Sequence, residues 1–229
     1  MNTETFEKTF WNYYLELERE YLEIERLIPF DKINYNTFSY KYLDLLWEIC
    51  SEIDVLFKEY MRIKEYSPEL DENGNPIFNI KQYEKFVEEK LPTFKNKEIT
   101  CYNPKFYNKK IYPFSLWTSN DSPKWWRVYN KIKHDKEQEL YGKKAYKCAN
   151  QICVLNALGA LFQLNLYIYE NLQSNGLIVP LQESLLFKLE RLGEDPYKYI
   201  INGKDSSKPV NDTIDAINAL LHKDIYGID

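Results

Sequence analysis

Three side chains in the stretch SPKWWRVYNKIKHDK, residues 122–136, have types and spacing that could do chemistry together: Arg127, Asn130 and His134. On an α-helix these positions fall within an arc of about 60°, so all three could meet one ligand. An arginine offers a fixed charge and a donor fork suited to phosphate, and a histidine can exchange a proton near neutral pH. Asn130 could orient an oxygen or the imidazole. The pattern favours phosphate chemistry, and the alternative is a solvated helical face without a ligand.

The charge around these residues differs from that of the rest of the chain. Residues 95–147, here called the basic segment, carry 13 lysines and arginines against 5 acidic residues, whereas the whole protein has a net charge of −5. A positive region in an acidic protein fits a phosphate-bearing partner, and its tyrosines and tryptophans could stack on bases. We expect an RNA strand to be held by four lysines of this segment: Lys124, Lys131, Lys133 and Lys136. A lysine-rich surface without a ligand would account for part of the charge.

Arg127, six intervening residues and His134, embedded in WWRVYNKIKHDK and followed by a long apolar helix, resemble the HEPN superfamily. The signature of that family is Arg, four to six residues, then His at a helix start. The likeness covers about residues 120–175. It implies an all-α bundle that dimerises so that two Arg/His pairs face one another. Val128 stands where the family has a polar residue, and Asn130 could supply that function.

The resemblance also implies a function, that of a metal-independent endoribonuclease acting as a toxin or phage-defence component. His134 would handle the proton of the ribose 2′-hydroxyl or of the leaving 5′-oxygen, and Arg127 would stabilise charge on the transition state. RNA, a second copy of the chain and an antitoxin or defence protein are the expected partners. Two alternatives remain: a non-catalytic HEPN-like module that binds RNA or a protein, and a purely structural bundle.

No cofactor or metal is expected. The segment DENGNP begins at Asp71 like a calcium loop, but Pro76 stands where such a loop needs glycine and Gln82 where it needs glutamate, so we predict a turn. The four cysteines form no CxxC pair. Cys148 and Cys153 would be rotated by roughly 140° on a helix, which makes them poor joint ligands and favours buried, reduced thiols.

The elements that must position the site are predicted to be mostly helical. Apolar residues three or four apart predict long helices over 4–28 and 37–66, with Tyr13 and Trp47 in their apolar stripes. Further helices are expected over 80–90, from 124 past His134, over 143–173, over 180–192 and within NDTIDAINALLHK, with an ordered loop over 93–122. Asp121 or Ser122 could cap the helix that follows.

These elements predict one all-α domain over residues 1–229, an antiparallel helical bundle with a core at about 4–192 and a C-terminal appendage at about 193–229. The uncharged segment 152–169 is near the lower limit for a membrane span, but amides such as Asn156 and Gln163 interrupt it. We therefore expect a central helix of a soluble, cytoplasmic protein without a membrane role. Because this helix is apolar on many sides, we also expect a two-fold dimer.

Overall fold

The structure, a computed structural model, describes residues 1–106, 108–173 and 181–189. By its internal contacts the chain divides into a unit of residues 1–190 and a unit of residues 191–229, and all the described residues belong to the first. The expected C-terminal appendage, with its short helix, lies outside the described residues. The described part is mostly helical but also contains two small β-sheets, so the expectation of a purely α-helical chain is wrong in that respect.

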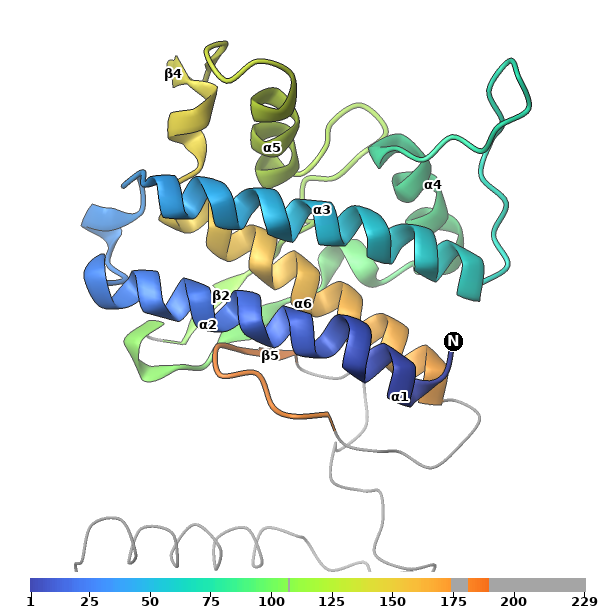
Figure 1. Cartoon of the computed structure of the whole chain (residues 1–229), viewed down its shortest axis with the longest axis horizontal. Helices are drawn as coiled ribbons and strands as arrows, with labels where there is room; N and C mark the ends of the chain where they lie inside the picture. Colours follow the sequence, from blue (N-terminus) through green and yellow to red (C-terminus); the bar gives the residue numbers. More distant parts are fainter. Residues whose placement is uncertain (107, 174–180, 190–229) are drawn as a thin grey trace, which may run out of the picture. The chain divides into compact units, whose positions relative to one another are not determined.

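Six α-helices and five short strands make up the described unit (Figure 1). The helices are α1 (Thr3–Phe6), α2 (Asn12–Leu27), α3 (Tyr40–Ile63), α4 (Ile80–Lys90), α5 (Lys124–His134) and α6 (Gln151–Gln173). The strands are β1 (Ile99–Cys101), β2 (Lys109–Ile111), β3 (Glu139–Leu140), β4 (Lys143–Lys144) and β5 (Phe187–Leu189). In Figure 1, α2 and α3 run antiparallel beside each other, and α6 contacts both.

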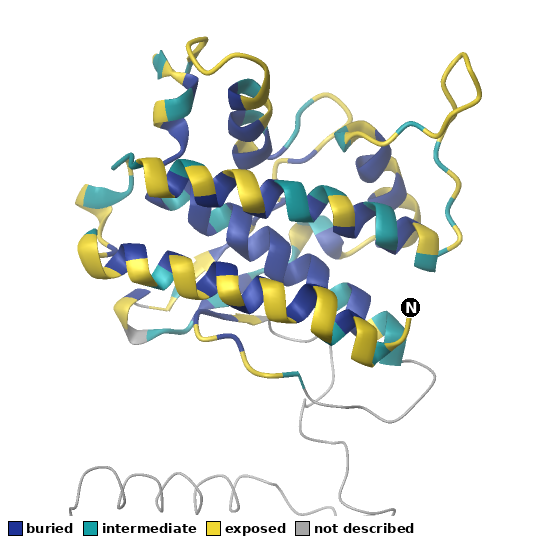
Figure 2. Ribbon diagram, in the orientation of Figure 1, coloured by how far each residue is buried: buried dark blue, intermediate teal, exposed yellow. Residues whose placement is uncertain are grey.

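The first long helix buries most of the predicted apolar stripe, and a π-helical turn, Glu7–Trp11, joins α1 to α2 within it. A π turn holds more residues than an α turn and therefore rotates the side chains that follow it. Trp11 and Tyr14 are buried, whereas Tyr13 is 38% exposed. The predicted place of Tyr13 in a buried stripe is therefore wrong, and the outer faces of α2 and α3 are exposed along much of their length (Figure 2).

The central helix of the unit is α6. It is long and apolar enough to cross a membrane by length and composition alone, but 78% of its most apolar window is buried inside the protein. Two of its buried amides donate within the chain: Gln163 Nε2 to the carbonyl of Phe94 at 2.6 Å, and Asn165 Nδ2 to that of Leu161 at 2.9 Å. The apolar surface of α6 therefore gives no reason to expect a dimer, although the dimer itself stays a prediction.

The long helix predicted over 143–173 begins later than expected. Residues 143–144 form β4, and a 3₁₀ helix, Ala145–Cys148, follows before α6 begins at Gln151. The side-chain oxygen of Asn150 accepts the backbone N–H of Cys153 at 3.1 Å, as an N-cap does. Asn150 is thus the local signal that ends the preceding turn and starts the helix.

Two segments predicted as loop and helix instead form a three-stranded antiparallel sheet in the order β2-β1-β5. β1 and β2 lie within the predicted loop, and β5 lies within the helix predicted over 180–192, which is therefore wrong. The reason is tertiary: the fully buried carboxylate of Glu18 accepts the backbone N–H groups of Leu185 at 2.7 Å and Leu186 at 3.1 Å. Because these N–H groups donate to Glu18 of α2, they do not donate to the carbonyls of a helix over 180–192.

Candidate functional site

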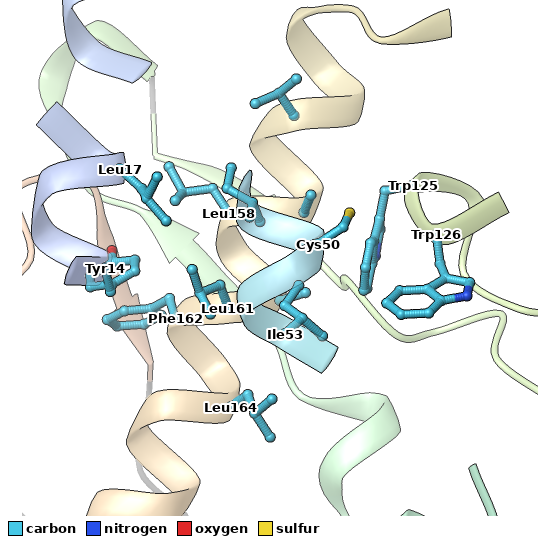
Figure 3. Close-up of a cluster of buried hydrophobic side chains, with 14 of the residues drawn as sticks. Tyr14, Leu17, Cys50, Ile53, Trp125, Trp126, Leu158, Leu161, Phe162 and Leu164 are labelled. Atoms are coloured by element: carbon cyan, nitrogen blue, oxygen red, sulfur yellow. The ribbon is translucent and has the colours of Figure 1, made fainter. Parts of the chain in front are cut away.

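The helix α5 is fixed to the core by one apolar face. Trp125 and Trp126 are 2% and 7% exposed, and Figure 3 shows both extending from α5 toward Cys50 and Ile53 of α3. The Trp125 indole donates to the carbonyl of Pro113 at 2.9 Å. The two tryptophans therefore hold the helix on the bundle from its buried side, and their burial leaves neither ring accessible for stacking on a base.

Val128 belongs to the same buried face, with 1% of its surface exposed. A polar side chain there would lose its hydration unless it found a partner in the core. The apolar residue after Arg127 therefore has a packing reason in this fold.

The opposite face of α5 carries the predicted site residues. Asn130 and His134 are exposed and Arg127 is half-buried, so helical geometry brings the three side chains to one accessible face. Arg127 and His134 are two helical turns apart, or about 10 Å along the axis. Both side chains would have to extend toward each other along the helix to contact one phosphate, and a second copy of the helix could bring another Arg/His pair to it.

Arg127 has a partner that the sequence did not assign to it. Its guanidinium NH1 lies 2.5 Å from Asp121 Oδ1, and the two side chains are 34% and 45% exposed. The backbone of Asp121 is fixed by two hydrogen bonds to Thr118, at 2.8 and 3.1 Å. The N-cap of α5 is Pro123, which makes no side-chain cap bond, so the prediction that Asp121 or Ser122 caps this helix is wrong.

His134 is the last residue of α5, exposed and directly before Asp135, where the chain leaves the helix. An exposed imidazole at this position can reach a ligand without any rearrangement of the core. Asn130, one turn earlier on the same face, is a polar side chain that could orient it.

The four predicted RNA-binding lysines surround this face. Lys131 Nζ donates to Gln138 Oε1 at 2.8 Å, Lys124 and Lys133 lie over tyrosine rings, and Lys136 is exposed just after the helix. Within the described ranges none of these four makes an ion pair, whereas five other cations of the basic segment do: Lys95, Lys105, Lys110, Arg127 and Lys144. The charge of these four lysines is therefore not neutralised by an ion pair with a described carboxylate.

A hairpin next to α5 was missed by the sequence reasoning. β3 and β4 pair antiparallel and are joined by Tyr141 and Gly142, both with positive φ, at 53° and 74°. The Lys124 ammonium lies 4.9 Å from the centre of the Tyr141 ring, and the Arg127 guanidinium lies 5.8 Å from it. The Tyr-Gly pair between short polar runs was the available signal.

The cysteines do not form part of a site. All four are free and buried, as predicted, and burial raises the pKa of Cys101 and of Cys153 to about 12. Their thiols therefore stay protonated at neutral pH, which disfavours nucleophilic or metal-binding roles. Across the described part of the chain, no group of three or more His, Cys, Asp or Glu could hold a metal ion.

The segment DENGNP forms the turn that the sequence predicted. Asp71 Oδ1 accepts the backbone N–H groups of Asn73 at 2.9 Å and Asn75 at 2.8 Å, and Gly74 has a φ of 83°. The carboxylate that would begin a calcium loop thus stabilises the turn itself.

Comparison of the chain with models of known protein families, with curated proteins and with solved structures found no match. The chemistry of the site is therefore argued from its own residues and geometry.

Proposed function

We propose that this chain is a metal-independent endoribonuclease of the HEPN type, built on an antiparallel helical bundle. The observation that carries the proposal is the division of α5 into two faces. One face, with Trp125 and Val128, is buried in the core, and the other turns Arg127, Asn130 and His134 outward. The lysines of α5 add positive charge that an RNA strand would neutralise.

In this proposal the nucleophile is the 2′-hydroxyl of the RNA itself. His134 takes the proton of that hydroxyl or gives one to the leaving 5′-oxygen, Arg127 stabilises the charge on the phosphate, and Asn130 orients the reacting groups. The products are a 2′,3′-cyclic phosphate and a 5′-hydroxyl. No metal-bound water takes part, so cleavage should persist in EDTA and fail on DNA.

The spacing of the two catalytic side chains makes a homodimer part of the proposal. Because Arg127 and His134 of one helix are about 10 Å apart along its axis, one phosphate could be served by residues of two facing copies. Light scattering at micromolar concentration should return twice the chain mass of 27.6 kDa. A strict monomer that still cleaves RNA would contradict this arrangement.

The second candidate is a non-catalytic module that binds RNA or a protein partner. The ion pair between Arg127 and Asp121 favours it, because a paired arginine is partly neutralised and must exchange its carboxylate partner for a phosphate. In an enzyme this exchange would accompany substrate binding. In a binding module the pair would remain and the lysines alone would hold the strand.

The decisive test is cleavage of a labelled RNA by the wild type and by Arg127→Ala and His134→Ala, with mass spectrometry of the product ends. Arg62→Ala is a matched control, since Arg62 is an exposed helical arginine paired with a glutamate three residues earlier. The other histidine, His222, gives the control His222→Ala. We expect both site variants to lose activity and both controls to keep it.

Each other result points to a different conclusion. A 3′-hydroxyl product, or activity abolished by chelator and restored by magnesium, would refute the chemistry. RNA that is retained but stays intact on clean protein would favour the binding module, and no binding at all would leave a structural bundle.

The biological setting belongs to the same proposal: a cytoplasmic toxin or phage-defence component with an antitoxin or defence protein as its partner. Expression of the wild type should arrest cell growth, and His134→Ala should relieve the arrest. Relief by the product of a neighbouring gene would identify the partner. Normal growth with active enzyme present would count against a toxin.

A further inference from the structure

The ring of Tyr141 lies at the tip of the β3–β4 hairpin in a backbone conformation that favours other residues. A two-residue loop with positive φ at both positions has the pattern of a type I′ turn, in which Asn, Asp and Gly are preferred. A bulky residue with positive φ is uncommon and strained. The turn geometry therefore gives no reason for a tyrosine at this position.

Packing does not require the tyrosine either, because 48% of its surface is exposed. The ring contacts Lys124 and Arg127 of α5. Burial of part of the side chain raises the pKa of Tyr141, and the charge of the nearby Arg127 opposes this rise. A half-exposed aromatic ring beside the candidate site, on a residue whose backbone is strained, is suited to contact a ligand.

Three cations gather around this ring. Lys124 and Arg127 lie 4.9 Å and 5.8 Å from its centre. Lys143 begins β4 directly after the hairpin tip. Burial raises the pKa of the nearby Cys148 thiol, and Lys143 and Lys124 are both close enough to oppose that rise. Among the residues that the structure describes, neither lysine makes an ion pair, so both charges are available to an anion.

We propose that Tyr141 and these cations form a nucleotide subsite, in which the ring stacks on one base of single-stranded RNA and Lys124 and Lys143 hold a neighbouring phosphate. Stacking on an aromatic side chain needs an accessible base face, which bases inside a duplex do not offer. The subsite rests on the proposed ribonuclease function and deepens it by naming the substrate class. Because Arg127 borders both places, the stacked nucleotide would lie next to the phosphate that is cut.

The test measures binding of a fluorescent, 2′-O-methyl single-stranded oligonucleotide, which the proposed chemistry cannot cleave. We expect Tyr141→Leu to weaken binding by roughly 5- to 150-fold, the loss typical of one base–aromatic stack. Tyr141→Phe keeps the ring and should bind like the wild type. Tyr13→Leu is the matched control, since Tyr13 is also a half-exposed tyrosine but lies beside Glu48, outside the basic segment.

An oligonucleotide with abasic sites separates stacking from a structural effect. If Tyr141 stacks on a base, the wild type should bind the abasic strand about as weakly as Tyr141→Leu does, and the variant should not distinguish the two strands. Tyr141→Asn, which suits the turn, should lose affinity in the same way while staying folded.

The possible failures are distinct. If the wild type binds RNA and Tyr141→Leu binds it equally well, or if the variant loses duplex and single-stranded RNA alike, the stacking subsite is wrong and the proposed function stands. If the wild type binds no RNA, the proposed function and the subsite are both overturned.

Discussion

Glu18 is fully buried on α2, and its replacement should destabilise the protein more than any exposed carboxylate can. Its carboxylate accepts the Tyr14 hydroxyl at 2.6 Å, the Ser184 hydroxyl, and the backbone N–H groups of Leu185 at 2.7 Å and Leu186 at 3.1 Å. These contacts join α2 to the segment that leads into β5. The third strand of the sheet therefore depends on one side chain that lies about 170 residues earlier in the sequence.

The magnitude follows from the number of donors that lose their acceptor. Each buried donor left unsatisfied costs about 1–3 kcal/mol, although water that enters the space and relaxation of the segment recover part of the sum. We expect Glu18→Ala to lower the free energy of unfolding by about 3–5 kcal/mol. Glu18→Gln can keep an oxygen toward Tyr14 and Leu186 but turns an amide N–H toward the N–H of Leu185, so it should cost about 1.5–3 kcal/mol.

Urea unfolding followed by tryptophan fluorescence measures the loss, and amide hydrogen exchange at Leu185 and Leu186 shows where it occurs. Glu16→Ala is the control, because Glu16 lies on the same helix, is 62% exposed in its side chain and pairs only with Arg19. That change should stay within about 0.5 kcal/mol of the wild type. The reasoning is refuted if Glu18→Ala is as stable as this control and exchange at Leu185 and Leu186 is unchanged.

Three further changes test other parts of the structure. Burial raises the pKa of Glu52 from its usual 4.5 to about 7. The folded protein therefore favours the protonated carboxyl, and its free energy of unfolding falls as pH rises from 4.5 through 7. Because the group is partly exposed, Glu52→Gln should stabilise the protein by about 1–2 kcal/mol at pH 8 and hardly at pH 4.5. Equal urea midpoints for the two proteins at pH 8 would count against this. Gly159→Val should cost about 2–4 kcal/mol, since a Cβ at position 159 would lie 2.5 Å from Ile111 Cδ1 of β2, and thermal melting checks it. Tyr141→Asn should raise the free energy of unfolding by about 0.5–1 kcal/mol because asparagine tolerates the positive φ, and an unchanged or lower stability would show that the turn does not strain the tyrosine.

The helices could be predicted from the sequence because their signal is local. The predicted ranges 37–66 and 80–90 overlap α3 and α4 closely, and the helix from residue 124 past His134 matches the start of α5. Apolar spacing of three or four residues acts within one or two helical turns. The π turn in the first helix could not be predicted in this way, because nothing in the spacing marks the extra residue.

The small sheet could not be predicted because its strands are three residues long and its pairing is distant. Ile99 of β1 lies opposite Leu189 of β5, so this pairing joins segments that are separated in the sequence by α5 and α6. Three residues carry too little periodicity to separate a strand from a loop. The helix predicted over 180–192 failed for the same reason, since the contact that decides its conformation comes from Glu18.

The helical face of the candidate site was predicted from the sequence. The two residues that contact Arg127 from neighbouring turns, Asp121 and Tyr141, were not. The exposure of Arg127, Asn130 and His134 follows from the 3.6-residue period of α5 and its buried tryptophans. Asp121 and Tyr141 lie in turns, and whether they reach Arg127 depends on how those turns pack against the helix. Sequence spacing contains no information about such packing.

The burial of Val128 bears on whether the proposed site can be active. The resemblance to the HEPN superfamily places a polar residue after Arg127, where this chain has Val128. In this fold that position is buried in the core, so a polar side chain there would be removed from any substrate. Asn130 is on the exposed face instead and can supply the polar group. In the proposed enzyme, activity then depends on whether a phosphate can replace Asp121 beside Arg127. The variant Asp121→Asn tests this, because it removes the carboxylate charge that pairs with Arg127. Faster cleavage or tighter RNA binding would indicate that the ion pair competes with the phosphate, and a loss of both would indicate that Asp121 is needed to position the guanidinium.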